Sequence, residues 1–248
     1  MRIPTVEGLI KRRILVNYRV DAEVMRRFLP SRFRPKLQGG YAIAGICLIR
    51  LEAIRPEGFP ALLGISSENA AHRVAVLWTE ADGREREGVF IPRRDTSSVL
   101  NHVAGGRIFP GEHQFADFKV NDRKGKIDFA MKSRDGRVSV ELRGSSSTTW
   151  PSASVFGSLA ETSRFFEAGS VGFSVTKTKD RFDGLQLETA FWKVEALTVD
   201  HVHSSFFADS ATFPSGSVEF DHALLMRDIP HRWLQEPDLH SAAPCVCT

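Results

Sequence analysis

Apolar and polar residues alternate along most of this chain, which is the period-two pattern of strands with one buried face. One stretch differs, because residues 41–54 (YAIAGICLIRLEAI) are almost continuously apolar and therefore predict a strand buried on both faces. Turns are expected at Ala81-Asp82-Gly83, Asn121-Asp122 and Arg134-Asp135-Gly136. Strands are predicted over residues 14–18, 41–54, 71–78, 88–92, 115–120, 126–132, 137–143, 172–176, 185–192, 194–203 and 217–226.

Helical spacing occurs in only three places. Asp21 can cap a short helix that Pro30 ends, and the residues Arg94 to Ser98 begin a brief helix over 99–103. The longest helix is predicted over Ser154 to Ala168, before a glycine. Strands outnumber helices and do not alternate regularly with them, so we expect an α+β fold with a mostly antiparallel β-barrel. No linker divides the chain, which predicts a single domain over residues 1–236 and a C-terminal tail over 237–248.

Composition adds little to this picture but excludes several classes. With 42% hydrophobic and 25% charged residues the chain is close to an average globular protein. It contains no run of about 20 apolar residues and no signal-peptide pattern, so we expect a cytoplasmic protein without a membrane segment. Cys47 is interpreted as a small buried hydrophobe, and no disulfide framework is expected.

The charge is unevenly distributed. Residues 1–60 hold twelve Lys and Arg against five Asp and Glu, although the formal net charge of the chain is only +3. These basic residues are scattered over a strand, a helix and a turn and lack an interleaved stacking motif. The pattern is typical of a solvated basic face, and we expect no nucleic-acid partner. A basic-faced interaction protein stays open as an alternative.

Two groups of residues have the chemistry of a small-molecule pocket. Glu68, Asn69 and Arg73 combine an acid, an amide and a cation at the start of a predicted strand. Arg93-Arg94 and Arg107, beside Gly105-Gly106, offer guanidinium groups that can grip a carboxylate with two hydrogen bonds. The alternatives are a solvated edge strand for the first group, and structural pairing with Asp95 or Glu112 for the second.

Other chemistries find less support. His201 and His203 share one strand face, a spacing that metal sites use, but the sequence places no third ligand (Asp200, Asp221 or His222) beside them. They are interpreted as hydrogen-bonded surface residues, so no metal is expected. The chain has no G-x-S-x-G elbow, Walker or dinucleotide-binding motif, and no cofactor is expected.

A family resemblance rests on five short segments, VDAEVMRRFLPSRFRP, GICLIRLEAIRPEGFP, SSENAAHRV, GVFIPRRDTSS and GGRIFPGEHQF. In this order they resemble the acetoacetate decarboxylase-like superfamily, and within it the uncharacterised YqjF-like family, a domain of unknown function. The resemblance spans about residues 8 to 235. It implies a cone-shaped, largely antiparallel β-barrel around a small cavity, commonly in homo-oligomers.

The resemblance also implies site residues. In the decarboxylases a glutamate and a G-R-E…G-x-P-K-K segment build the site, and a lysine of that segment forms a Schiff base with a β-keto acid. Glu68 matches the glutamate and Gly106-Arg107 the start of the segment, but no lysine follows before Lys119. A desolvated amine is what makes imine formation efficient at neutral pH, so Schiff-base decarboxylation is not expected. Whether Lys119 or Lys193 faces the cavity is left open.

Two functions compete on the same pocket. The first is a lyase or decarboxylase-like enzyme for a small oxo or carboxylic acid, in which Glu68 is the acid or base, Arg107 clamps the carboxylate and His113 carries the proton. The second is a non-enzymatic barrel that binds or senses a small acidic or apolar metabolite. In both, the ligand-binding residues are expected to be Asn69, Arg73, Arg93 and Glu112.

Overall fold

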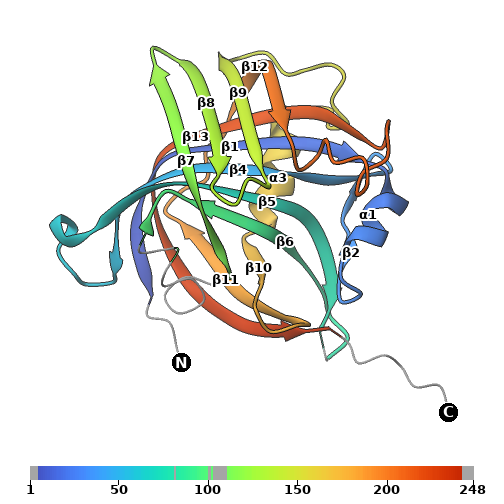
Figure 1. Cartoon of the computed structure of the whole chain (residues 1–248), viewed down its shortest axis with the longest axis horizontal. Helices are drawn as coiled ribbons and strands as arrows, with labels where there is room; N and C mark the ends of the chain where they lie inside the picture. The colour runs from blue at the N-terminus through green and yellow to red at the C-terminus, as the bar shows by residue number, and fades with distance from the viewer. Residues whose placement is uncertain (1–4, 81, 100–101, 103–110, 242–248) are drawn as a thin grey trace.

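The structure is a computed structural model that describes residues 5–80, 82–99, 102 and 111–241 (Figure 1). Its helices are α1 (Ala22–Phe28), the 3-10 turn η1 (Ala61–Leu63) and α3 (Leu159–Ala168). None of the helices in this part of the chain is long and apolar enough to cross a membrane. The strands are β1 (Val6–Val20), β2 (Arg34–Pro35), β3 (Leu37–Gln38), β4 (Tyr41–Pro56), β5 (Ile65–Thr79), β6 (Glu85–Thr96), β7 (His113–Arg123), β8 (Lys126–Ser133), β9 (Ser139–Ser147), β10 (Val171–Val175), β11 (Arg181–Thr189), β12 (Glu195–Ser204) and β13 (Val218–His240).

All these strands belong to one sheet that closes on itself (Figure 1). The sheet forks at two strands. One edge of β6 pairs with β5, and its other edge pairs first with β10 and then with β7. One edge of β13 pairs with β1, and its other edge pairs first with β12 and then with β11. Two closed paths of paired strands therefore share the wall β13-β1-β4-β5-β6. One path returns through β10 and β11, and the other through β7, β8, β9 and β12. This arrangement confirms the predicted α+β, barrel-like fold. The pairs of β6 with β7 and β10 are parallel, and the other described pairs are antiparallel.

The shared wall is buried on both faces, as residues 41–54 predict. Ala44, Ile46 and Leu48 of β4 belong to a first core cluster, which also contains most of the aromatic rings near α1. The alternate residues Cys47 and Ile49 belong to a second core cluster, against which α3 packs. Because side chains of a strand point alternately to its two faces, one apolar run lines two cores at once.

The first helix agrees with the sequence. The Asp21 carboxylate accepts hydrogen bonds from the backbone N–H groups of Glu23 and Val24, both at 2.9 Å, and α1 ends before Pro30. The helix predicted over Ser154 to Ala168 is shorter than expected, since α3 begins at Leu159. Ser154 and Val155 donate hydrogen bonds to the carboxylate of Asp221, and these bonds hold the residues before Leu159 out of the helix. The helix predicted over 99–103 falls largely outside the described residues.

Several strands also differ in length from the prediction. The hairpin turn of β7 and β8 lies at Lys124-Gly125, three residues after the predicted Asn121-Asp122, and both of its residues have positive φ. β1 begins at Val6 instead of Ile14. β13 continues from the predicted end at Met226 to His240, because its second half pairs with β11. Long-range pairing extends these strands past the point where alternation fades.

Candidate functional site

A cavity of about 280 Å³ lies between the second core cluster and α3, and we call it the site cavity. Its apolar wall comes from strands on opposite sides and from the chain after α3, and includes Ile49, Leu51, Ile91, Leu187, Trp192 and Trp233. Its polar wall contains Arg13, Cys47, Asn69, Arg73, Arg94 and His113, together with the carboxylates of Asp95, which is paired with Arg93, and of the exposed Glu167. A volume of this size, mostly apolar with a few convergent polar groups, is typical of a site for a small molecule.

Arg73 is the most enclosed cation of this wall. It lies on β5, where alternation directs Asn69, Ala71 and Arg73 to the site cavity, and it is only 4% exposed. One terminal N–H donates to Oδ1 of Asn17 on β1, and the guanidinium lies over the ring of Phe166 on α3 at 4.6 Å. Its Nε and Nη1 have no hydrogen-bond partner within the described part of the chain. Burial lowers the pKa of Arg73 to about 10, still well above neutral pH.

Two further arginines border the site cavity. Arg13 of β1 directs Nε to Sγ of Cys47 at 3.4 Å and lies near the ring of Trp192, 5.9 Å from its centroid. Arg94 of β6 donates from Nε to Oγ of Ser174 at 2.9 Å, and burial lowers its pKa to about 10. Within the described residues, neither these two arginines nor Arg73 forms an ion pair with a carboxylate, although thirteen other arginines do.

His113 is placed beside Arg94 by the parallel pairing of β6 with β7, in which these two residues are opposite each other. Burial, and then the nearby charge of Arg94, lower the pKa of His113 to about 3. The imidazole is therefore neutral at physiological pH and is a weak proton acceptor.

Arg73 is held by a chain of buried polar groups that leads away from the site cavity. The amide of Asn17 contacts Nε2 of His222 at 2.9 Å, and Nδ1 of His222 is 2.6 Å from Oδ1 of Asp221. Burial lowers the pKa of His222 despite the nearby carboxylate. The carboxylate also accepts hydrogen bonds from Ser154 and Val155, at 2.6 and 3.0 Å. The network ties the guanidinium to the segment that precedes α3.

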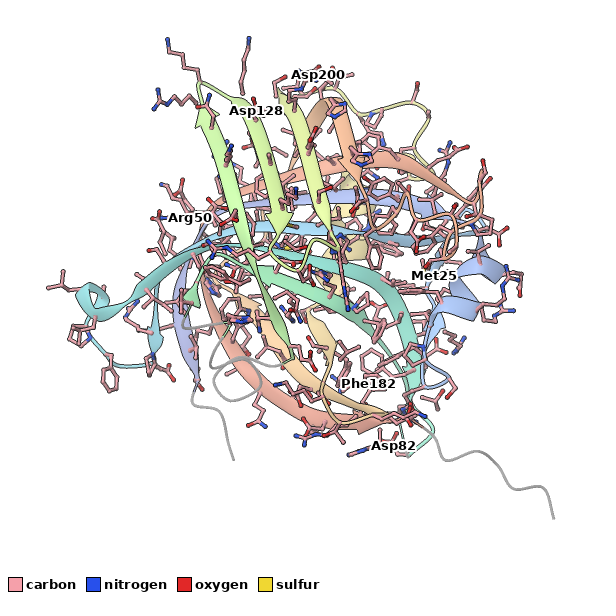
Figure 2. All side chains as sticks on the ribbon, viewed as in Figure 1. Met25, Arg50, Asp82, Asp128, Phe182 and Asp200 are labelled. Carbon is pink, nitrogen blue, oxygen red and sulfur yellow. The ribbon has the colours of Figure 1, made fainter. Side chains whose placement is uncertain are left out.

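Three residues predicted from the sequence lie in the site cavity, namely Asn69, Arg73 and His113. Glu68 does not line it, because it follows the opposite alternation of β5 and forms an ion pair with Arg12 at 2.7 Å. Burial raises the pKa of Glu68, against the nearby charge of Arg12. Figure 2 shows Arg50, the residue opposite Glu68 in the pairing of β4 with β5, at the periphery of the molecule.

The remaining predicted residues lie elsewhere. Arg93 forms ion pairs with Asp95 at 2.7 Å and Asp135 at 3.1 Å, so the structural pairing considered for it is the one observed. Arg93 and Glu112 border a separate second cavity and do not line the site cavity. Arg107 lies outside the described residues.

Arg13 and Cys47 were not predicted as site residues from the sequence, and Arg94 was considered only together with Arg93. Nothing in the sequence singled out Arg13, which follows Lys11 and Arg12, precedes the strand predicted over residues 14–18, and was counted with the solvated basic residues. Nothing in the sequence distinguished Cys47 from a small core residue, because its arginine neighbour comes from a different strand.

No lysine lines the site cavity within the described residues, and Lys119 and Lys193 are both exposed. His201 lies 3.5 Å from the carboxylate of Glu141. Within the described ranges, no group of three or more His, Cys, Asp or Glu side chains is arranged to hold a metal ion.

Comparisons with known proteins agree with this architecture. A family model described as an uncharacterized conserved protein matches residues 10–218. None of the curated proteins matches the sequence significantly. Three solved structures illustrate the similarity of fold. The enduracididine biosynthesis enzyme MppR complexed with pyruvate is 15% identical, with a TM-score of 0.56, over 98% of this chain and 91% of that one.

The other two are decarboxylase-like. Acetoacetate decarboxylase from Legionella pneumophila is 13% identical, with a TM-score of 0.58, over 97% of this chain and 88% of that one. An acetoacetate decarboxylase-like enzyme from Sphingomonas wittichii RW1 is 12% identical, with a TM-score of 0.59, over 98% and 95%. At these identities the likeness shows the fold, and the fold is acetoacetate decarboxylase-like, as the sequence segments predict.

Proposed function

This chain belongs to the DUF2071 family and has the acetoacetate decarboxylase-like fold, and we propose that it binds a small carboxylic acid in the site cavity and acts on it as a lyase-type enzyme. The observation that carries the proposal is the group formed by Arg13, Arg73 and Arg94. These guanidinium groups border one small cavity, and none of them forms an ion pair with a carboxylate among the described residues, since Asp95 at the same wall is paired with Arg93 and Glu167 is exposed.

Such an arrangement is costly without a ligand. Removing a charged group from water costs about 5 kcal/mol for a deeply buried ion, even after the protein relaxes, unless an opposite charge is supplied. The other arginines of the chain illustrate the usual solution, as Arg93 does with its two aspartates. An anionic ligand in the site cavity would remove this cost for the unpaired guanidinium groups.

The free donors match a carboxylate in particular. Nε and Nη1 of Arg73 have no hydrogen-bond partner within the described residues, and a guanidinium presents its N–H groups as a planar fork that fits two carboxylate oxygens. The apolar remainder of the wall, including Ile49 and Leu187, leaves room for a short carbon chain. The related MppR structure is complexed with pyruvate, an acid of this class.

Lyase chemistry at this site would proceed without an imine, because the described wall offers no amine. Loss of carbon dioxide or of a proton from the carbon next to a carbonyl group leaves an enolate with negative charge on oxygen, which the partly buried guanidinium of Arg94 would stabilise. The imidazole of His113, beside Arg94, is neutral and can only form a hydrogen bond with the ligand oxygen.

Binding without turnover is the second candidate, and a specific observation favours it. A general base works best with a pKa near the working pH, whereas the pKa of His113 is about 3 and Glu68 lies away from the site cavity. On this reading the protein holds or senses an acidic metabolite.

A ligand panel distinguishes the two candidates. Thermal unfolding and product formation, followed by NMR, are measured with acetoacetate, pyruvate and propionate. An enzyme shows both stabilisation and product, and a binding protein shows stabilisation alone. If none of the acids stabilises the protein at millimolar concentration, the proposal is wrong. Borohydride reduction with acetoacetate should leave no adduct on a lysine.

Location and assembly stay predictions. A cytoplasmic protein and a homo-oligomer are expected, the latter from the superfamily resemblance. Light scattering of the purified chain measures its mass directly, and a monomer at micromolar concentration would contradict the expected assembly.

A further inference from the structure

We propose that the thiol of Cys47 is the nucleophile of the site cavity and adds reversibly to the carbonyl carbon of a 2-oxo acid whose carboxylate is bound by Arg73. This inference rests on the proposed function, since it needs a carboxylate in the site cavity. It names the substrate class and the residue that takes the place of the missing amine.

The position of Cys47 supports this role. It lies in the middle of β4, opposite Leu15 of β1 and Ala71 of β5, and its side chain borders the site cavity. The thiol is free, and Nε of Arg13 is 3.4 Å from Sγ. This contact brings a cationic side chain to the sulfur at the wall of the site cavity. A cysteine used only for packing needs no such neighbour.

Arg73 provides the second, independent observation. It is 4% exposed, borders the same cavity, and two of its nitrogens lack a hydrogen-bond partner within the described residues. Arg73 follows Ala71 by two positions on β5, so it shares the face of the residue opposite Cys47. Cys47 and Arg73 therefore border the site cavity from neighbouring strands, about 4.8 Å apart, so the thiol and a carboxylate bound by Arg73 face the same small space.

Arg94 completes the arrangement from β6. Arg94 borders the same cavity as Cys47 and Arg73, and its Nε donates to Oγ of Ser174 at 2.9 Å. The sulfur therefore shares one cavity wall with both guanidinium groups. One of them can hold the carboxylate while the other faces the oxygen of the carbonyl group.

The addition needs no other reactant. A bond forms between Sγ and the carbonyl carbon, the carbon–oxygen π bond breaks, and its electron pair goes to oxygen. The proton that the thiol loses ends on that oxygen, which gives a hemithioketal. The reverse steps return the thiol and the free oxo acid, so nothing is oxidised or reduced.

Charge-selective alkylation tests the environment of the thiol. The C245S/C247S variant leaves Cys47 as the single cysteine, because the chain has three. Iodoacetate and iodoacetamide have nearly the same shape and leaving group but differ in charge. We expect Cys47 to react about tenfold faster with the anion, while glutathione in the same buffer prefers the neutral reagent. Arg94→Gln should reduce the preference, and the exposed Arg137→Gln should not.

Carbon-13 NMR tests the covalent step. Pyruvate labelled at its carbonyl carbon should give a new tetrahedral-carbon signal with the wild-type protein and none with Cys47→Ala. Lactate, which has the same carboxylate but no carbonyl, should stabilise both proteins without forming an adduct.

The outcomes separate the two proposals. Stabilisation by pyruvate and lactate without an adduct overturns the role of Cys47 and leaves carboxylate binding intact. Failure of Cys47 to react with either alkylating reagent, or a preference for iodoacetamide, overturns it as well. If neither acid stabilises the protein, both proposals fall.

Discussion

Arg73 and Phe166 meet at the site cavity, where the guanidinium carbon lies 4.6 Å from the centroid of the Phe166 ring. The aromatic face stabilises the cation that the rest of the wall leaves unpaired, and it does so from the last turns of α3. The same ring is 7% exposed and belongs to the second core cluster. Phe166 of α3 thus forms part of the wall of the site cavity and part of the second core cluster.

Phe166→Ala should therefore lower the free energy of unfolding substantially. We expect a loss of about 3–5 kcal/mol, as for other buried phenylalanines, because the substitution leaves a cavity and removes the ring from the cation. Urea unfolding measures the change. Phe59→Ala is the matched control, since Phe59 is 55% exposed and its substitution should change stability by less than about 0.5 kcal/mol. A loss below about 1 kcal/mol for Phe166→Ala would contradict the role given to α3.

Asn17→Ala tests the network behind Arg73. The substitution removes the acceptor of Arg73 and the neighbour of His222, and each orphaned buried group costs about 1–3 kcal/mol. We expect a loss of stability in that range or above, measured by urea unfolding, together with weaker carboxylate binding. Asn121→Ala, at an exposed position of β7, is the control and should leave both properties unchanged. Unaltered carboxylate affinity in a folded Asn17→Ala protein would show that the network does not position Arg73.

His72 should make stability depend on pH. It is fully buried beside the first core cluster, with its ring centroid 4.4 Å from that of Phe206. Burial, and then the nearby charge of Arg93, lower the pKa of His72 from 6.5 to about 3. Below pH 6.5 the unfolded chain binds a proton that the folded one excludes, so stability falls as the pH drops toward 3. The slope for one such group approaches about 1.4 kcal/mol per pH unit.

His72→Phe removes this dependence and keeps an aromatic ring in the core. Unfolding free energies at pH 7.5 and pH 5 should differ less in the variant than in the wild type, by about 2 kcal/mol. The pH-dependent contributions of all other groups cancel in this difference. Equal losses of stability in the two proteins would mean that His72 is protonated in the folded state.

Much of the fold could be predicted from the sequence. The continuous apolar run over residues 41–54 identified the doubly buried wall, and the alternation of the later strands identified the antiparallel hairpins. The extensions of β1 and β13 could not be predicted, because pairing with distant strands decides where they end. The start of α3 was missed for a similar reason, since the carboxylate that binds Ser154 lies 67 positions away along the chain.

The site was predictable only in part. Asn69 and Arg73 were selected because they offer an amide and a cation, beside an acid, at the start of a predicted strand, and in the structure a period of two places both on one face. The same period directs Glu68 to the other face, which only the register of β5 could reveal. Arg13 and Cys47 come together from separate strands, and their 3.4 Å contact has no local signature.

The central claim is that unpaired guanidinium groups make the site cavity a carboxylate site, and calorimetric titration with pyruvate and with pyruvamide tests it most directly. The two molecules have nearly the same shape, but only pyruvate carries the charge. We expect pyruvate to bind at least tenfold more tightly, which corresponds to about 1.4 kcal/mol, and Arg94→Gln to weaken pyruvate binding while Arg137→Gln does not. Equal affinity for the acid and the amide, or undiminished pyruvate binding in Arg94→Gln, would contradict the account.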